Sequence, residues 1–290
     1  MYGAIIGDIV GSKYEFGNFK SKDFPLFQKG CDYTDDTIMT VAVAEALLRA
    51  RAEKVSFRKV LVEEMQGYGR MYPHPQGAYG GRFAAWLQTK DPRPYNSFGN
   101  GSAMRVSPCG LIAVTMEEAL ELAKASAEVT HNHPEGIKGA QAAAAAVYLA
   151  RAGAPKEEIR EYIQKNFYPL DKTLDEIRPT YRFDESCQKT VPQAITAFLE
   201  STSFEDAIRN AVSLGGDSDT IGAITGSIAW SHYWGRAWGM PIPGDMKAIR
   251  EQAEVYLPEN LLAVVREFEE VAAHRLATYD RVGMVGRIPV

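Results

Sequence analysis

The sequence predicts an all-α fold in a single domain, residues 1–290. Apolar residues recur at three- and four-residue spacing along most of the chain, which is the period of an amphipathic helix. No segment shows sustained two-residue alternation, so a substantial sheet is not expected. No low-complexity linker or sharp change of composition divides the chain. The spacing predicts helices over residues 36–51, 56–69, 117–128, 136–152, 156–166, 191–201, 204–214, 220–235, 245–256 and 259–276.

Local signals mark where these helices begin and end. Gly153 and Pro155 stop one helix, and Ser203 caps the start of a later one, which carries acidic residues in its first turn. The segment from Ala277 onward has no helical period and is expected to pack as an extended strap. Long loops rich in glycine and proline are usually functional. Such loops are expected over residues 13–33, 72–82 and 91–110.

Small residues recur on one face of several predicted helices. Because they let two helix backbones approach closely, they predict tightly packed central helices, although a glycine inside a helix costs about 0.5–1 kcal/mol relative to alanine. The residues concerned are Gly3, Gly7 and Gly11, then Gly222 and Gly226, and the alanine-rich run 140–146.

Composition and charge exclude several classes of protein. The chain is 46% hydrophobic and 24% charged, as is usual for a globular protein, and its formal net charge is −5. A general polyanion-binding surface is therefore not expected, and polymeric nucleic acid is not an expected partner. Recognition of phosphate, if present, must be local and built from backbone amides or a single arginine.

Cysteine use and the absence of targeting segments favour a cytoplasmic protein. Cys31, Cys109 and Cys187 are scattered without CxxC spacing, so reduced thiols are expected. No apolar run approaches the roughly 18 residues of a membrane span. The N-terminal residues lack a basic segment and soon reach Asp8, unlike a signal peptide. We expect a cytoplasmic monomer.

Two acidic clusters, far apart in the sequence, are the strongest indication of function. Thr34-Asp35-Asp36-Thr37 and Asp217-Ser218-Asp219-Thr220 each precede a predicted helix. Taken singly, either cluster could simply cap its helix. Together they crowd four carboxylates, which repel one another unless a cation lies between them. Oxygen donors of this kind favour Mg²⁺, Mn²⁺ or Ca²⁺ over Zn²⁺, and a two-metal site is the predicted outcome.

Three further features surround the clusters. The segment Ser97 to Arg105 contains Gly-Asn-Gly and could form an anion-binding nest of backbone amides, or only a turn. His131 and His133 have H-x-H spacing, but without a third nitrogen or sulfur ligand nearby a substrate hydrogen bond or a helix cap is favoured over zinc. Glu15 is the one acid in a small and aromatic stretch, and by itself is typical of a solvated loop residue.

Taken in order, these motifs resemble those of the ADP-ribosylglycohydrolase family. The matching stretches are Gly7-Asp8-Ile9-Val10-Gly11-Ser12, Tyr33-Thr34-Asp35-Asp36-Thr37, Tyr79-Gly80-Gly81-Arg82, Gly99-Asn100-Gly101-Ser102-Ala103-Met104-Arg105, Thr130-His131-Asn132-His133-Pro134 and Gly215-Gly216-Asp217-Ser218-Asp219-Thr220-Ile221-Gly222.

The resemblance implies a compact, orthogonally packed helical bundle, with its site where helix N-termini converge. It implies two divalent cations, Mg²⁺ or Mn²⁺, and Glu15 and Asp36 as catalytic residues. The implied metal ligands are Thr34, Asp35, Asp36, Asp217, Asp219 and Thr220. The implied substrate-binding residues are Tyr79, Gly80, Phe98, Gly99, Asn100, Gly101, Ser102, Met104, Arg105 and His131.

By the same resemblance, the expected reaction is hydrolysis at the anomeric carbon of the distal ribose of an ADP-ribosyl group. The substrate would be an ADP-ribosylated protein or an ADP-ribosyl small molecule. The stretch from Gly7 to Glu15 resembles the branch that cleaves O-linked (serine) ADP-ribose, which favours that linkage over N-linked arginine. The alternatives are an inactive ADP-ribose-binding module and a two-metal phosphoesterase that cleaves the diphosphate.

Overall fold

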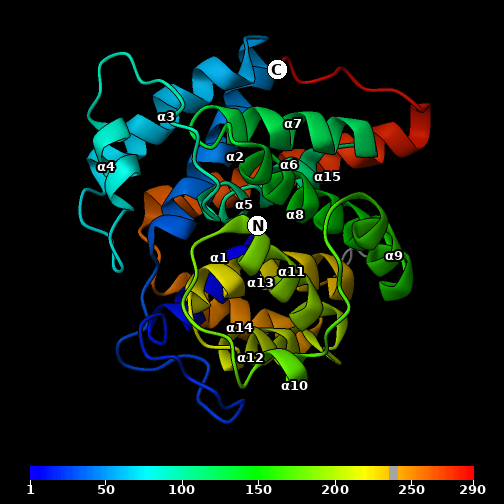
Figure 1. Ribbon diagram of the computed structural model, residues 1–290. Coiled ribbons are helices and arrows are strands. Elements are labelled where there is room, and N and C mark those ends of the chain that lie inside the picture. Colours follow the sequence, from blue (N-terminus) through cyan, green and yellow to red (C-terminus); the bar gives the residue numbers. More distant parts are fainter. Residues whose placement is uncertain (235–240) are drawn as a thin grey trace.

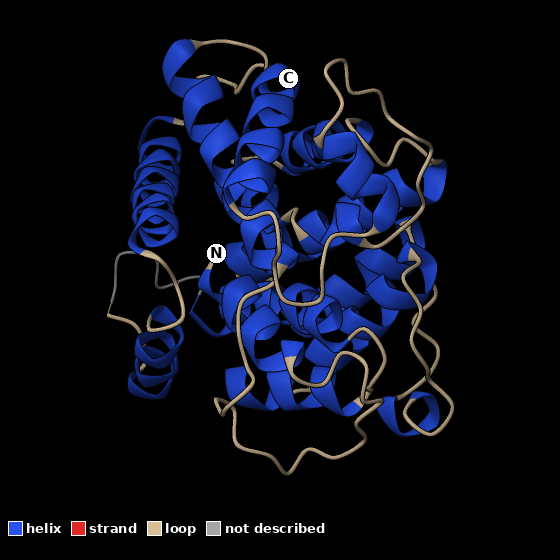
Figure 2. Cartoon of the chain, turned by 90° about the vertical axis from the view of Figure 1, so that its left-hand side faces the viewer, coloured by secondary structure: helices blue, strands red, loops and turns tan. Residues whose placement is uncertain are grey.

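Helices form the framework of the protein in the computed structural model, which describes residues 1–234 and 241–290 (Figure 1). These residues contain no strand, so the all-α prediction is confirmed. Long loops gather on the side that faces the viewer in Figure 2. The helices are α1 (Tyr2–Ser12), α2 (Asp35–Glu53), α3 (Phe57–Met71), α4 (Gly81–Leu87), α5 (Gly101–Met104), α6 (Ser107–Ile112), α7 (Met116–Glu128), α8 (Pro134–Ala152), α9 (Lys156–Asn166), α10 (Leu174–Ile177), α11 (Cys187–Leu199), α12 (Phe204–Ser213), α13 (Ser218–Trp234), α14 (Gly244–Glu254) and α15 (Glu259–Val282).

The predicted helices are all present, and their ends differ by a few residues. The last residue of the helix predicted over 220–235 lies outside the described residues. The short helices α4, α5, α6 and α10 were not expected, because so few turns show no period in a sequence. Helix α15 continues to Val282 and stops at Gly283, which has a φ of 70°. The prediction of an extended segment from Ala277 onward is therefore wrong for residues 277–282, which belong to α15.

Helices α1 and α13 pack backbone against backbone at the centre of the molecule (Figure 1). A Cβ atom added to Gly7 would overlap the carbonyl oxygen of Gly222, and one added to Gly3 would overlap that of Gly226. One turn further on, the Ser218 hydroxyl donates to the carbonyl oxygen of Gly11 at 2.9 Å. The expected close packing is confirmed, and it brings the start of α13 beside the end of α1.

Helix α8 provides the second closely packed element. Its alanine run, residues 140–146, is buried apart from Gln141, and the helix contacts α5, α6, α7, α11 and α13. His133 caps its first turn, since the Nδ1 atom accepts from the backbone N–H of Glu135 at 3.1 Å. The H-x-H pair is therefore a helix cap together with a separate histidine, and not two ligands of one ion.

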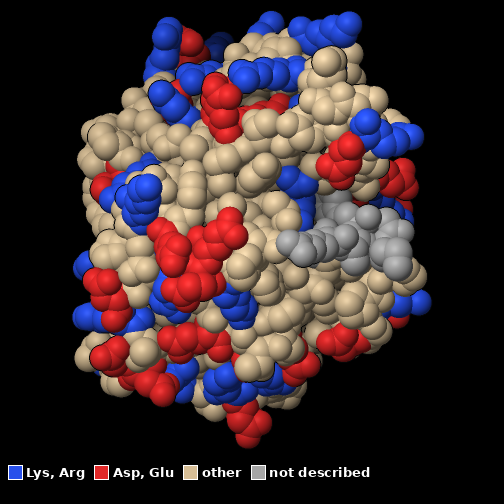
Figure 3. All heavy atoms as spheres, turned by 90° about the vertical axis from the view of Figure 1, so that its right-hand side faces the viewer, with Lys and Arg blue, Asp and Glu red and all other residues tan. Residues whose placement is uncertain are grey.

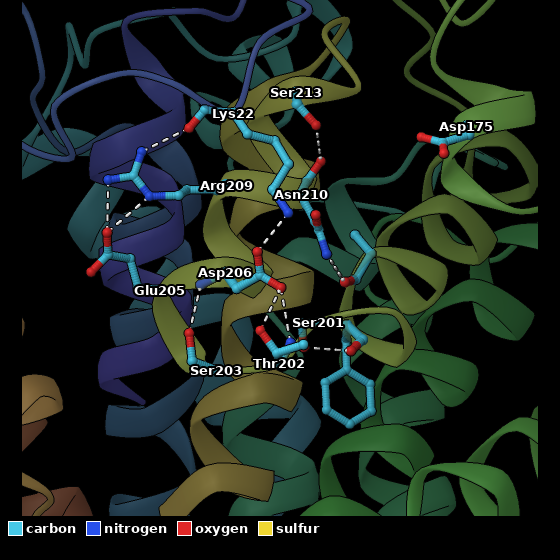
Figure 4. A network of polar contacts seen from close by, with 12 residues as sticks. Lys22, Asp175, Ser201, Thr202, Ser203, Glu205, Asp206, Arg209, Asn210 and Ser213 are labelled. Carbon is cyan, nitrogen blue, oxygen red and sulfur yellow. Dashed lines mark hydrogen bonds and ion pairs between the residues drawn. The ribbon is translucent and has the colours of Figure 1, made fainter.

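The loop between α1 and α2 is tied to α12 by a polar network (Figure 4). Lys22 Nζ lies 2.5 Å from Asp206 Oδ1. Arg209 Nη1 donates to the backbone carbonyl oxygens of Lys22 at 2.8 Å and Phe24 at 2.7 Å, while Glu205 accepts from the same guanidinium. Because this loop carries Glu15 at one end and leads to the first acidic cluster at the other, the network helps to position both.

The mixed charge of the surface and the free cysteines match what the composition predicts. On the face shown in Figure 3, basic and acidic side chains are interspersed, and acidic ones gather near the middle. Cys31, Cys109 and Cys187 are free and buried. Within the described ranges, no helix has the length and apolar character that crossing a membrane requires.

Candidate active site

A cavity of about 310 Å³ lies where the two acidic clusters meet. Its wall combines buried carboxylates with a glycine-rich loop, a histidine and two arginines. The lining residues are Glu15, Asp35, Asp36, Ala78, Gly80, Gly81, Arg82, Phe83, Tyr95, Ser97, Gly99, Asn100, Gly101, Met104, Arg105, His131, Glu185, Asp217, Asp219 and Thr220.

Asp8, on α1, fixes the start of α2. Its carboxylate accepts from the backbone N–H groups of Thr34 (3.0 Å) and Thr37 (3.1 Å), and from their hydroxyls at 2.7 and 2.5 Å. The side chain is fully buried, and burial raises its pKa to about 6 in spite of these four donors. These bonds hold the first acidic cluster against α1 without the help of a bound ligand.

The first cluster reaches the second through Asp36. Thr34 caps α2, because its hydroxyl oxygen accepts from the backbone N–H of Asp36 at 3.1 Å. The Asp36 carboxylate is 3% exposed, and its Oδ2 accepts from the hydroxyl of Thr220 at 3.3 Å. Residues 184 positions apart in the sequence are therefore in direct contact.

The second cluster enters the cavity from a glycine turn. Gly215 and Gly216 have φ values of 68° and 72°, a backbone conformation that side chains disfavour. After this turn, Asp217 and Asp219 both line the cavity, while the Ser218 hydroxyl turns away to α1. Asp217 Oδ2 accepts from Asn100 Nδ2 at 2.6 Å, which ties this cluster to the glycine-rich loop.

Glu15 completes the acidic wall. One carboxylate oxygen each from Glu15, Asp217 and Asp219 lie within 4.8 Å of one another. Burial and the neighbouring charge of Asp219 raise the pKa of Glu15 to about 8. The loop residue that the sequence alone shows as solvated is in fact 8% exposed and belongs to the cavity.

The acidic wall fits a hard divalent cation. Burial, together with the charge of a neighbouring aspartate, raises the pKa of Asp36 and of Asp219 well above the ordinary value, and burial raises that of Asp217 to about 7. In addition, Asp36 Oδ1 and Glu15 Oε2 are buried without a hydrogen-bond partner in the described part of the chain. A bound cation would both satisfy these oxygens and offset the repulsion.

Around His131 the cavity offers hydrogen-bond donors and a positive charge instead of carboxylates. Its Nδ1 lies 2.7 Å from the Thr130 hydroxyl, which also accepts from Arg105 Nη2 at 2.8 Å. Burial lowers the pKa of His131, so the ring is neutral. The Thr130 hydroxyl can donate its proton to Nδ1, and in that tautomer Nε2 carries the ring proton. That Nε2 lies against Gly99 and Gly101, where a ligand would meet a donor.

Arg105 is a buried cation beside this donor. It is 1% exposed, bonds to the Ser126 carbonyl oxygen and the Thr130 hydroxyl, and forms no ion pair within residues 1–234 and 241–290. Burial lowers its pKa to about 10, so it stays charged at neutral pH. A buried positive charge that also lines the cavity favours an anionic ligand.

The structure brings most of the predicted site residues to the cavity, but not all. Thr34 bonds to Asp8, and Ser102 donates to the Gly136 carbonyl oxygen at 2.7 Å. Tyr79 donates to the carbonyl oxygen of Tyr72, and Phe98 packs against His133. The predicted residues that line the cavity are Glu15, Asp35, Asp36, Gly80, Gly99, Asn100, Gly101, Met104, Arg105, His131, Asp217, Asp219 and Thr220.

Sequence reasoning assigned no role to several residues that the structure places here. Asp8 had a usable signal, since an aspartate between Ile6 and Ile9 in a glycine-rich apolar helix must be buried and satisfied. Arg82, at the start of α4, ends one of the stretches that resemble the family, which was its signal. Tyr95 and Glu185 had none, because ordinary loop residues reveal their neighbours only in the folded chain. The Arg82 guanidinium lies 4.8 Å from the centre of the Tyr95 ring.

The family of the chain follows from comparison with known proteins. A family model described as ADP-ribosylglycohydrolase matches residues 1–278. The chain belongs to the ADP-ribosylglycohydrolase family. The family fold is also found in a solved structure, an "ADP-ribosylglycohydrolase-related protein complex", with a TM-score of 0.67 and 25% identity, over 95% of this chain and 94% of that one.

Curated relatives within the family carry two kinds of name. The "ADP-ribosylarginine hydrolase Tri1" of Pseudomonas putida is 26% identical, over 80% of this chain and 69% of its own. The "ADP-ribosylhydrolase ARH3" of Gallus gallus is 25% identical and that of Homo sapiens 26%, each over 80% of this chain and 83% of theirs. These members of the family are ADP-ribosyl hydrolases by name, and they differ in whether arginine is specified.

Proposed function

We propose that the protein is a metal-dependent hydrolase that releases ADP-ribose from a modified side chain or an ADP-ribosyl small molecule. The bond cleaved is the glycosidic bond at the anomeric carbon of the distal ribose. The observation that carries this proposal is the contact between Asp36 and Thr220, which joins the two acidic clusters around one cavity. Membership of the family supports the substrate class.

The two chemistries of the cavity match two adjoining parts of ADP-ribose, the diphosphate and the distal ribose. The diphosphate would lie by the glycine-rich loop, near the charge of Arg105 and the Nε2 donor of His131. The distal ribose would then reach the carboxylates of Asp36 and Asp219. Asn100 lies between the two regions, because its side chain bonds to Asp217 while its backbone belongs to the loop.

Glu15 is proposed as the general base that takes a proton from the attacking water. Its carboxylate lies beside Asp217 and Asp219, and its Oε2 has no hydrogen-bond partner in the described chain. A base with a pKa near neutrality accepts a proton effectively while still being partly ionised. Burial, together with the neighbouring carboxylates, raises the pKa of Glu15 to about 8, and neutralisation of those neighbours would bring it lower.

Asp35, Asp36, Asp217, Asp219 and Thr220 would hold two divalent cations, Mg²⁺ or Mn²⁺, in this proposal. When bound, such ions neutralise the carboxylates and polarise oxygen atoms of the ribose and of water. The proposed linkage is O-linked, serine type, because the stretch Gly7 to Glu15 resembles the branch with that activity.

The deciding experiment compares purified wild type with Glu15→Gln on an O-linked ADP-ribosyl peptide with Mg²⁺ or Mn²⁺. We expect turnover to fall by about 10²–10⁴-fold in the variant, the usual contribution of a general base, with ADP-ribose affinity retained. Full activity of the variant would contradict the role of Glu15. Binding without any product in the wild type would indicate an inactive module, and release of AMP would indicate a phosphoesterase.

A further inference from the structure

Lys20 joins the loop that carries Glu15 to two backbone segments far away in the sequence. Its Nζ atom donates to the carbonyl oxygen of Tyr181 at 2.8 Å and to that of Leu214. Burial, together with the nearby charge of Arg182, lowers its pKa to about 8, so the group is charged at neutral pH. In the described part of the chain it bonds to these main-chain oxygens and not to a carboxylate, so its role is to fix the path of the backbone.

One of the two bonds holds the end of α12. Leu214 is the C-cap of this helix, and the chain leaves it there for the second acidic cluster. The last carbonyl oxygens of a helix have no partner within it and carry the negative end of the helix dipole. Lys20 satisfies the carbonyl oxygen directly before the turn of Gly215 and Gly216. A residue of the Glu15 loop therefore fixes the start of this turn.

The glycine turn lies between the two segments that Lys20 connects. A Cβ atom on Gly215 would come within 2.7 Å of Asn18 Oδ1, and one on Gly216 within 2.8 Å of the Tyr181 ring. The ammonium group of Lys20 also lies 5.9 Å from the centre of that ring, within the range of a cation–π contact. The turn is thus enclosed on both sides, and Lys20 ties the two sides together.

Such support matters because the glycines of the turn have other backbone conformations open to them. Asp217 and Asp219 follow the turn directly, and one carboxylate oxygen of each lies within 4.8 Å of one from Glu15. A shift of the turn would move both aspartates relative to Glu15. Lys20 connects the two parts of the chain whose separation sets these distances.

Lys22, two residues further along the same loop, has a different environment. Its Nζ atom pairs with Asp206 at the other end of α12, and its side chain is 43% exposed (Figure 4). The backbone carbonyl of Lys22 is held separately, by Arg209. Removal of this ammonium group therefore takes away only an exposed ion pair, which usually contributes little.

We propose that Lys20 is a positioning residue, whose ammonium group holds the Glu15 loop and the glycine turn in the arrangement that turnover and cation binding require. The inference rests on the proposed function, in which Glu15 and the two aspartates act on one ribose. Lys20 does not line the cavity, so it acts through these residues and not on the substrate.

The test compares Lys20→Met, which keeps the length of the side chain and removes the donors, with Lys22→Met. Calorimetric titration with Mn²⁺ and kinetics on an O-linked ADP-ribosyl peptide at saturating Mn²⁺ are the measurements. In Lys20→Met, Mn²⁺ affinity should fall about tenfold and kcat about 10–100-fold, because a small displacement of reacting groups is costly. KM should stay within about twofold, since the diphosphate is proposed to bind at the separate Gly99 to Arg105 loop. Lys22→Met should keep all three values within about twofold.

A second pair of variants decides the matter if Lys20→Met does not fold. Lys20→Gln keeps an amide donor on a shorter side chain, and Lys22→Gln is its control. We expect Lys20→Gln to lose part of kcat and of Mn²⁺ affinity, and Lys22→Gln to lose neither. Equal values in these two variants would overturn the proposal.

Three results with Lys20→Met would also overturn it. A lower melting temperature with unchanged kcat and Mn²⁺ affinity would make Lys20 a residue of the fold alone. A loss confined to KM would place its ammonium group against the substrate. Losses of the same size in Lys22→Met would show that the loop as a whole, and not Lys20, sets the arrangement.

The proposed function and this inference fail in different ways. If the wild type binds Mn²⁺ but hydrolyses nothing, the proposed function fails, and the Mn²⁺ affinities of the two lysine variants still decide the inference. If the wild type is active and Lys20→Met equals it, the inference fails and the proposed function stands. A wild type that binds no Mn²⁺ would overturn both.

Discussion

The two acidic clusters occupy the same cavity but are held in different ways. The first belongs to a helix start whose amides and hydroxyls bond to the buried Asp8. The second follows a turn of two left-handed glycines and is held by Asn100. One half of the site is therefore fixed by a buried carboxylate inside the core, and the other by a glycine turn, the Asn100 side chain and the bond from Ser218 to α1.

The largest effect, on the stability of the fold, is expected at the α1–α13 contact, which helps to bring the two acidic clusters together. Gly7→Ala should destabilise the protein by more than ~3 kcal/mol, because its Cβ overlaps backbone atoms that cannot move aside. Chemical denaturation measures the change. Gly67→Ala is the matched control, since nothing lies within 4 Å of its Cβ, and it should be neutral or stabilising by about 0.5–1 kcal/mol. Equal behaviour of the two variants would contradict the close contact.

Asp217→Ala should affect the second acidic cluster and leave the first in place. We expect divalent-cation affinity and turnover to fall together, turnover by about 10²–10³-fold, because a charge that stabilises the reacting centre is lost. Calorimetric titration with Mn²⁺ and a product assay measure the two quantities. Normal cation affinity in this variant would place the ion elsewhere.

Asp8→Asn should affect the first acidic cluster indirectly, through the residues that Asp8 holds in place. An amide group cannot accept from all four donors of Thr34 and Thr37, so α2 loses part of its orientation. Loss of a group that orients ligands commonly costs about 10–100-fold in metal affinity. A Mn²⁺ titration checks this value, and Asp245→Asn, in the first turn of α14, is the surface control.

The pH dependence of stability tests the acidic wall as a whole. The pKa is raised to about 6 in Asp8, about 7 in Asp217 and about 8 in Glu15, so the folded chain binds more protons than the unfolded chain from about pH 4 to pH 8. Stability of the metal-free protein should therefore fall as pH rises through this window. His131 and His232, with lowered pKa values, oppose this trend only below about pH 6.5.

The measurement is the melting temperature in EDTA at pH 5.5 and pH 7.5. We expect the higher value at pH 5.5, and a smaller difference when Mn²⁺ is saturating, because the ion replaces the protons. A metal-free protein that is more stable at pH 7.5 would show that the acidic wall does not hold these protons.

The smallest effect is expected at the histidine. Thr130→Val removes the hydroxyl that fixes the His131 tautomer, with little change in volume. We expect ADP-ribose affinity to fall by up to about tenfold, the size of one net hydrogen bond. The test is calorimetric binding, and Thr89→Val, on an exposed loop, serves as control. Unchanged affinity would mean that the ring orientation does not depend on Thr130.

The long helices could be predicted because they depend on local sequence, and the pairing of the clusters could be predicted because four carboxylates need a shared cation. A period of 3.6 residues is visible over several turns, and an Asp-rich helix start next to glycine has few explanations. The resemblance to the family then identified Glu15, which composition alone would leave in solvent. The meeting of the two clusters was an inference from the chemistry of their carboxylates, and the structure places Asp36 and Thr220 in contact.

The remaining features depend on long-range contacts. Helices α5 and α10 have four residues each, too few for a period. Glu185 reaches the cavity because its backbone carbonyl accepts from the N–H of Asn100, a contact without a sequence signal. Ser102 belongs to the glycine-rich motif, yet it bonds into α8, so a motif gives the segment and not the direction of each side chain.

The glycine contact between α1 and α13 has a consequence for how the family can vary. Side chains in a core adjust their rotamers when a neighbour changes, whereas two touching backbones leave nothing to adjust. The distance between the carboxylates carried by these helices is thereby insulated from substitutions in the surrounding core. Residues at the rim of the cavity can then diverge without disturbing the arrangement of these carboxylates.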